Sequence, residues 1–106
     1  MPKKSMETLT ESMFYVLMAF CHGPKAGTEV ATFIQNRTKG RIKMGPATLY
    51  TLLGKFETEK LIRETLVDGR KRTYQITDKG RRAYEEELNR LRKCVADAEG
   101  GSSYVR

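Results

Sequence analysis

Apolar residues recur at helical spacing near the start of the chain, and this spacing predicts a first helix that ends at about Phe20. Thr8 and Glu11 have the spacing of a capping box, in which a hydroxyl and a carboxylate satisfy free amides at the helix start. The two apolar faces of this helix consist of Leu9, Met13, Phe14, Tyr15, Val16, Leu17, Met18, Ala19 and Phe20. A helix that is apolar nearly all round needs burial on two sides, so we expect a second chain to supply part of its cover.

Two further helices are predicted after a turn at residues 23–27, which contains glycine and proline. The second helix runs from Thr28 to about Arg37. A basic loop follows, and the third helix begins at Gly45-Pro46, because proline suits the first helical position. The inward face of the third helix is formed by Leu49, Leu52, Leu53 and Phe56.

The hydrophobic period then changes from helical to alternating. Residues 62–67 and 73–76 are predicted to be two strands joined by a turn at Asp68-Gly69, which is typical of a β-hairpin. Thr77 is expected to cap a last helix that runs to about Ala98. One apolar stripe recurs along that helix at helical spacing, and it consists of Tyr84, Leu88, Leu91 and Val95.

This order of elements predicts a mainly α protein with a β-hairpin, namely a winged helix-turn-helix domain followed by a long C-terminal dimerisation helix. We expect residues 1–7 to be a flexible N-terminal arm and residues 8–76 to form the winged domain. Residues 77–98 are the predicted dimerisation helix, and residues 99–106 a disordered tail. A helix of roughly 20 residues is about 30 Å long. Such a helix extends beyond so small a domain, so we expect a second chain to bury its apolar stripe.

The charge of the chain points to a polyanionic partner. The 106 residues carry a net charge of +7, and the sequence pI is near 9.6. No acidic residue lies between Glu29 and Glu57, although five Lys and Arg residues do. The hairpin tip adds three consecutive bases. Each cluster alone fits a solvated face, but on a helix-turn-helix and its wing they together favour double-stranded DNA.

The third helix has the side chains that a DNA-reading helix needs, because short side chains read base edges while Lys and Arg bind phosphates. Thr51 can hydrogen-bond a base edge, Ala47 can meet a thymine methyl group, and Lys55 can reach phosphate or guanine. Tyr50 fits either a DNA contact or closure of the core against the second helix. We predict that DNA is bound by Lys43, Ala47, Thr48, Tyr50, Thr51, Lys55, Arg70, Lys71 and Arg72.

Two segments resemble the PadR family of transcriptional regulators: GPATLY at residues 45–50 and GRKRTYQITDKG at residues 69–80. Leu9-Thr10-Glu11 and Gly23-Pro24 fit the first helix and first turn of that family, so the resemblance covers residues 9 to about 98. It implies a homodimeric bacterial regulator, usually a repressor, of the short subfamily with a single C-terminal helix. We therefore expect binding to a pseudo-palindromic operator.

The resemblance also places the first helix beside the last helix of the other subunit. It implies a dimer interface that includes Phe14, Met18, Tyr84, Leu88, Leu91 and Val95. A flat, apolar small-molecule effector is expected in a pocket formed by Phe14, Tyr15, Met18, Leu91 and Val95, and a tightly packed interface without a cavity is the alternative. The chain has no Trp, which some drug-binding members use, and Ala26-Gly27-Thr28 stands where His-Gly-Tyr is usual.

Other function classes find no support in the sequence. Motifs for nucleophilic catalysis, phosphate loops and metal ligands are absent, so we expect no enzyme, no cofactor and no metal. The longest apolar run, Met13 to Cys21, is far shorter than the about 20 residues of a membrane span. Two cysteines without a CxxC motif favour a cytoplasmic protein, and a redox role for Cys94 stays open.

The alternative function is a basic RNA-binding or protein-interaction winged-helix module. RNA binding is disfavoured because the hairpin offers only Tyr74 for stacking, and we expect Tyr74 to face the core.

Overall fold

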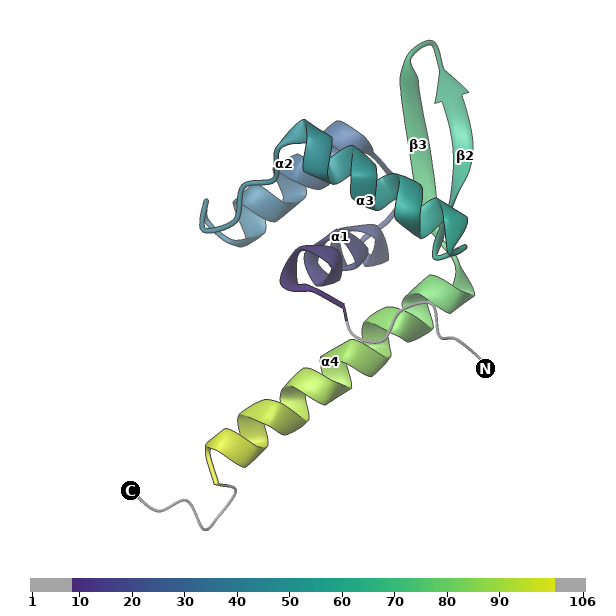
Figure 1. Ribbon diagram of the computed structural model, residues 1–106. Helices are drawn as coiled ribbons and strands as arrows, with labels where there is room; N and C mark the ends of the chain where they lie inside the picture. Colours follow the sequence, from purple (N-terminus) through teal and green to yellow (C-terminus); the bar gives the residue numbers. More distant parts are fainter. Residues whose placement is uncertain (1–8, 101–106) are drawn as a thin grey trace.

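The computed structural model describes residues 9–100, which form four helices and a three-stranded sheet. Figure 1 shows how the helices and the hairpin of β2 and β3 are arranged. Residues 1–8 and 101–106, where we predicted the arm and most of the tail, lie outside the described residues. The elements are α1 (Glu11–Cys21), β1 (Lys25–Ala26), α2 (Gly27–Arg37), α3 (Pro46–Thr58), β2 (Ile62–Asp68), β3 (Lys71–Ile76) and α4 (Asp78–Ala98). The predicted fold class is confirmed: three helices, a hairpin wing and a long last helix follow one another in the expected order.

Helix α1 is capped by a different residue from the one predicted. The Thr10 hydroxyl accepts from the Met13 amide at 3.1 Å, and the Met13 sulfur accepts from the Thr10 amide at 3.5 Å. The capping box predicted from Thr8 and Glu11 is therefore wrong, because Thr10 is the N-cap and Glu11 is the first helical residue. The Glu11 carboxylate instead accepts from Arg41 at 3.2 Å. Thr8 lies outside the described residues.

Helix α1 lies at the centre of the core, where α2, α4 and β3 pack around it. The sequence predicted that a second chain would help to cover this helix, but the chain's own α4 supplies much of the cover. The Phe14 ring stacks on Tyr84 of α4, with ring centroids 5.0 Å apart and an interplanar angle of 15°. Phe14 is consequently only 8% exposed within one chain. The largest fully buried side chains are Phe20, Phe56, Leu17, Ile34, Leu53, Ile62, Val16 and Val30.

Strand β3 is the central strand of an antiparallel sheet with the order β1-β3-β2. We predicted only a turn where β1 lies, because two residues are too few to show an alternating pattern. β1 pairs Ala26 with Thr73, and this pairing joins the hairpin to the start of α2. The hairpin of β2 and β3, residues 62–76, is called the wing below. Its turn contains Gly69, whose φ of +64° lies in the left-handed region that favours glycine.

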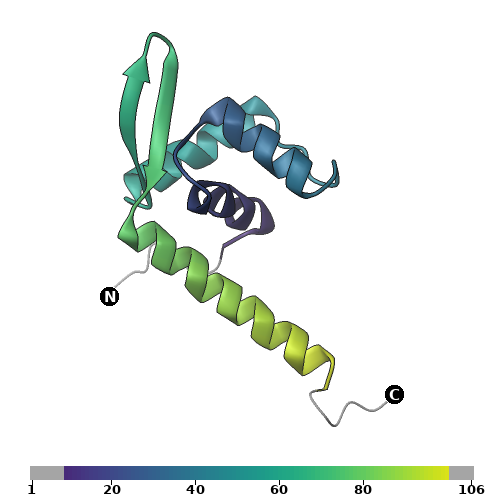
Figure 2. The ribbon, with the colours of Figure 1, turned by 180° about the vertical axis from the view of Figure 1, so that it is seen from behind.

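Helix α4 begins against the base of the wing and then leaves the body of the molecule (Figures 1 and 2). Thr77 caps it as predicted: its hydroxyl oxygen accepts from the Gly80 amide at 3.0 Å and its hydroxyl donates to the Lys60 carbonyl at 2.6 Å. Gly80 lies so close to the Leu61 carbonyl oxygen that an added Cβ would overlap it. Residues 92–99 are all exposed, so only the first part of α4 belongs to the core.

Candidate nucleic-acid interface

Helix α3 is anchored on one face and open on the other. Pro46 occupies its first turn, and Leu49, Leu53 and Phe56 are buried beneath it. The opposite face carries exposed short side chains and one exposed lysine, Lys55. This face is hollowed by about 250 Å³ between Ala47, Thr48, Thr51 and Leu52. A helix with such a surface can approach base edges in a major groove closely.

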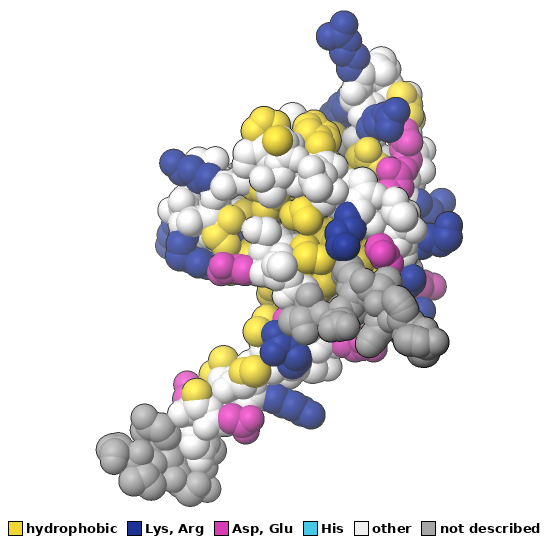
Figure 3. Space-filling model, in the orientation of Figure 1, with side chains coloured by type: hydrophobic (Ala, Val, Ile, Leu, Met, Phe, Trp, Pro, Cys, Tyr) yellow, Lys and Arg dark blue, Asp and Glu magenta, His cyan; other side chains and the backbone are white. Residues whose placement is uncertain are grey.

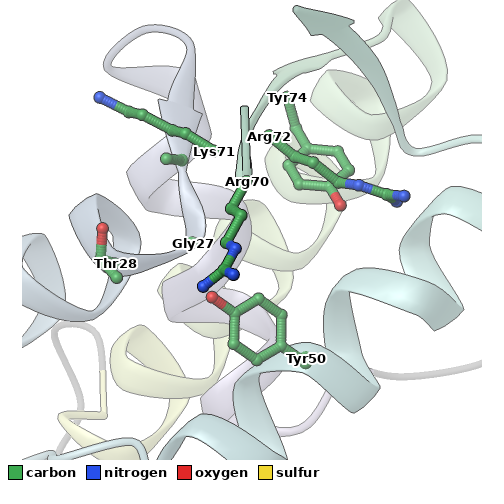
Figure 4. A pocket seen from close by; sticks show the side chains of 8 residues that line it. Gly27, Thr28, Tyr50, Arg70, Lys71, Arg72 and Tyr74 are labelled. Carbon is green, nitrogen blue, oxygen red and sulfur yellow. The ribbon is translucent and has the colours of Figure 1, made fainter. Parts of the chain in front are cut away.

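A groove of about 330 Å³ separates α3 from the wing (Figure 4). One wall is Tyr50 of α3, and the other comes from the wing and the start of α2. Arg70 points from the wing toward the hydroxyl end of Tyr50. The groove is lined by Ala26, Gly27, Thr28, Tyr50, Arg70, Lys71, Arg72 and Tyr74. Exposed Lys and Arg side chains, together with the exposed hydroxyl groups of Thr28 and Tyr50, make this groove suited to phosphate oxygens.

Tyr50 is exposed yet held in place. Its side chain is 54% exposed, and its ring lies on the backbone of Gly27 at the start of α2. A Cβ at Gly27 would lie 3.0 Å from Cε1 and 3.1 Å from Oη of Tyr50, so a larger residue would push the ring away. Tyr50 therefore covers the start of α2 while its hydroxyl faces the groove. Its contact with DNA stays a prediction.

The loop before α3 supplies further positive charge. Arg41 is engaged within the chain, since its guanidinium donates to the Tyr15 hydroxyl at 3.0 Å and to Glu11 at 3.2 Å. Lys43 and Lys55 form no ion pair with any residue between 9 and 100. Figure 3 shows Lys and Arg side chains at the wing tip and around the α2–α3 loop, on two sides of the face that α3 occupies. Positive charge thus flanks the open face of α3.

A second cavity, of about 350 Å³, lies between the start of α1 and the middle of α4. Glu87 at its edge is only 7% exposed, and its carboxylate accepts from Arg90 Nε at 2.9 Å. That hydrogen bond holds the pKa of Glu87 below its usual range. Phe14, Tyr15 and Leu91 of the predicted effector pocket line this cavity, whereas Met18 and Val95 do not. Its full lining is Leu9, Thr10, Glu11, Phe14, Tyr15, Glu87, Arg90 and Leu91.

Other sites are not found in the described part of the chain. Residues 9–100 contain no group of three or more His, Cys, Asp or Glu side chains that could hold a metal ion. No helix within these residues combines the length and the apolar character needed to cross a membrane. Both cysteines are free thiols, and burial raises the pKa of the Cys21 thiol. The open face of α3 and the groove beside it therefore form the candidate site.

Comparison with known families agrees with this geometry. Residues 16–86, more than half of the chain, match the transcriptional regulator PadR-like family. The chain belongs to the PadR-like family of transcriptional regulators. Members of this family regulate transcription and are not enzymes, so the predictions of a PadR-like regulator and of no enzyme are confirmed. No match was found among the curated proteins.

Solved structures of other regulators share the fold of this PadR-like protein. A transcriptional regulator from Clostridium thermocellum is 20% identical, with a TM-score of 0.72 over 83% of this chain and 88% of that one. Bacillus subtilis PadR in complex with operator DNA is 18% identical, with a TM-score of 0.66 over 74% of this chain and 47% of PadR. Bordetella bronchiseptica BpsR, whose DNA binding is regulated by 6-hydroxynicotinic acid, is 22% identical, with a TM-score of 0.68 over 88% and 62% of the chains.

In this PadR-like regulator, the structure brings the predicted DNA-binding residues to one region. All nine are exposed, on α3, on the loop before it and at the wing tip. Sequence reasoning missed Gly27 and Thr28, which line the groove beside them. A glycine at the start of a helix, shortly after Pro24, is a signal of close backbone approach that could have identified this wall of the groove.

Proposed function

We propose that this PadR-like regulator is a homodimeric repressor that binds a pseudo-palindromic operator and is released by a small apolar molecule. The observation that carries DNA binding is the open face of α3, whose short side chains lie between the bases of the wing and those of the α2–α3 loop. Short side chains can read the edges of DNA bases, while the flanking Lys and Arg side chains bind phosphates. The complex of Bacillus subtilis PadR with operator DNA supports the same use of the fold here.

DNA binding is tested with a duplex that the protein selects from a randomised pool. Fluorescence anisotropy should show tight binding to this duplex, weaker binding to an unselected one, and a steep loss of affinity with salt. Lys55→Ala should weaken binding, whereas Lys93→Ala on the exposed end of α4 should not. Equal binding to single-stranded RNA would favour the alternative of a basic RNA-binding module.

A homodimer is supported by the part of the last helix that the chain itself leaves uncovered. Val95 is 55% exposed, and Leu88 and Leu91 are only partly buried against the core. Phe14 is already buried by its own α4, so we expect the partner to meet the α4 stripe more than Phe14. Two-fold symmetry would place two α3 helices in successive major grooves, about 10 base pairs apart.

The dimer is tested by placing a charge in the stripe. Burying a leucine contributes about 1.5–3 kcal/mol, and a buried unpaired carboxylate is costly. Leu88→Glu should therefore sediment as a monomer and lose operator binding. The neighbouring substitution Asn89→Glu, at an exposed position, should leave the dimer intact. A folded Leu88→Glu variant that stays dimeric would contradict the interface.

An effector site is supported by the cavity between α1 and α4. Its volume of about 350 Å³ lies in the range of small-molecule pockets. Tyr15 and Glu11 form part of its wall, and both are hydrogen-bonded to Arg41 in the loop that leads to α3. A ligand that displaces these side chains would thereby move the loop before the reading helix. Regulation of BpsR by 6-hydroxynicotinic acid supports the same principle in a related fold.

Planar aromatic compounds test the effector site. We expect at least one compound in a panel to release the selected duplex and to raise the melting temperature of the free protein. Leu91→Trp should fill the cavity and abolish release, whereas Lys93→Trp, which lies outside both the lining and the apolar stripe of α4, should preserve it. If no compound releases the duplex, the cavity is not an effector site.

A further inference from the structure

The three bases of the wing have different surroundings, although they are consecutive in sequence. Lys71 Nζ lies 3.6 Å from a carboxylate oxygen of Glu29 on α2. Arg72 Nε lies 3.9 Å from a carboxylate oxygen of Glu64 on the neighbouring strand β2. Arg70 forms no ion pair with any residue between 9 and 100. Among residues 9–100, Lys71 and Arg72 of the wing therefore lie beside carboxylates, whereas Arg70 does not.

Glu29 is fixed in position by the start of its own helix. Its Oε1 atom accepts from the Ala26 amide at 2.7 Å, and Ala26 is paired with Thr73 of the wing. The other oxygen is left facing Lys71. The hydrogen bond from the Ala26 amide, followed by the charge of Lys71, holds the pKa of Glu29 below its usual range, so Glu29 is ionised near neutral pH.

We propose that Glu29 is a positioning residue that keeps Lys71 away from DNA, so that Arg70 supplies the wing's phosphate contact. For Lys71 to bind a phosphate it would have to leave Glu29, whose uncompensated carboxylate would then face the negative backbone. Arg70 has no such competitor, and Figure 4 shows it pointing into the groove toward Tyr50. With fewer phosphate contacts, the wing adds little affinity that is independent of DNA sequence. Glu29 thereby raises the affinity for the operator relative to that for an unselected duplex. This inference rests on the proposed DNA binding.

The test measures how affinity depends on salt for the selected duplex and for an unselected one. Each phosphate neutralised changes the slope of log affinity against log salt by about 0.9. Glu29→Gln keeps an oxygen for the Ala26 amide but releases Lys71, so its slope should steepen by about 0.9 per subunit. Its affinity for the unselected duplex should rise several-fold, and its preference for the selected duplex should fall.

Three companion variants complete the design. Arg70→Ala should flatten the slope by about 0.9 per subunit, whereas Lys71→Met should leave it near the wild-type value. Glu29→Gln combined with Lys71→Met should restore the wild-type slope. Glu85→Gln, on the exposed face of α4, removes the same charge far along the chain from the wing and controls for net charge.

The outcomes separate this inference from the proposed function. If the wild-type protein shows no salt-dependent binding to duplex DNA, DNA binding itself is refuted. If wild-type binding is as proposed but Glu29→Gln behaves like Glu85→Gln, the role of Glu29 is refuted alone. The role of Glu29 is also refuted if Lys71→Met flattens the slope of log affinity against log salt as much as Arg70→Ala does. This comparison can be made even if Glu29→Gln fails to fold.

Discussion

The contact between Gly27 and Tyr50 offers a test in which stability and DNA affinity should move in opposite directions. Gly27 is the first residue of α2, and no left-handed backbone angle requires glycine there. Alanine is favoured over glycine in helices by up to about 1 kcal/mol. Gly27→Ala should therefore be neutral or stabilising by several tenths of a kcal/mol, provided that the Tyr50 ring can move.

The size of the required movement follows from the structure. The new Cβ would lie 3.0 Å from Cε1, 3.1 Å from Oη and 3.2 Å from Cζ of Tyr50, whereas ordinary contacts begin near 3.4 Å. The crowded atoms Cε1, Cζ and Oη are all at the hydroxyl end of the ring, so we expect the half-exposed ring to relieve the contact by rotating as a whole toward solvent. Its hydroxyl would then leave the groove beside Arg70. A hydrogen bond to a charged group contributes about 1.5–3 kcal/mol, so operator affinity should fall about tenfold or more.

Urea denaturation and anisotropy titration of the same preparations measure the two effects. Tyr50→Phe is the matched control. It should lose similar operator affinity, but because it keeps Gly27 it should not show the stabilisation expected of Gly27→Ala. The double variant should lose little more affinity than either single variant, because both remove the same contact. Wild-type affinity in Gly27→Ala, together with weak binding by Tyr50→Phe, would refute the argument that Gly27 positions the ring. A strongly destabilised Gly27→Ala would show that the ring cannot move.

Gly80, Thr51 and Glu87 each allow a further test. Gly80→Ala should lower the free energy of unfolding by about 1–3 kcal/mol despite its better helix propensity, because its Cβ would overlap the Leu61 carbonyl oxygen; urea denaturation measures this. Thr51→Ala should cost about 1 kcal/mol of binding to the selected duplex and little to an unselected one, and equal losses in anisotropy would remove Thr51 from the reading face. The pKa of Glu87 is lower in the folded protein than in the unfolded chain, where it is about 4.3, so its ionised form stabilises the fold. This contribution is complete above the unfolded pKa and is lost as the pH falls through the folded pKa. Glu87→Gln should remove this part of the acid sensitivity in thermal melts between about pH 5 and 3, and an unchanged pH profile would contradict the role of its hydrogen bond with Arg90.

Local pattern was enough to predict most elements of this protein. Proline at the first turn of α3, the threonine cap of α4 and the glycine turn of the wing act on residues within one turn of themselves. Helical and alternating periods show which face of each element is apolar whatever the partner of that face is. For the same reason the exposure of the bases on α3 and the wing was predictable.

Contacts between distant segments were not predictable from that pattern. Strand β1 is two residues long and exists because β3 pairs with it. The apolar face of α1 had to be covered, but the sequence does not state by what, and the structure covers Phe14 with Tyr84 of the same chain. Thr10 rather than Thr8 caps α1, since two threonines two residues apart are equally suited by type.

The sequence by itself determined the order of the elements, the apolar side of each helix and the placing of positive charge on α3, on the loop before it and on the wing. These depend on residue type and spacing along one segment. Only the tertiary structure decided how the three wing bases differ, because Lys71 meets Glu29 across a span of 42 residues while its neighbour Arg70 meets no acid in the described chain. It also placed Tyr50 on Gly27. Such pairings arise when separately folded elements pack together, and no periodicity along the chain encodes which two side chains then face one another.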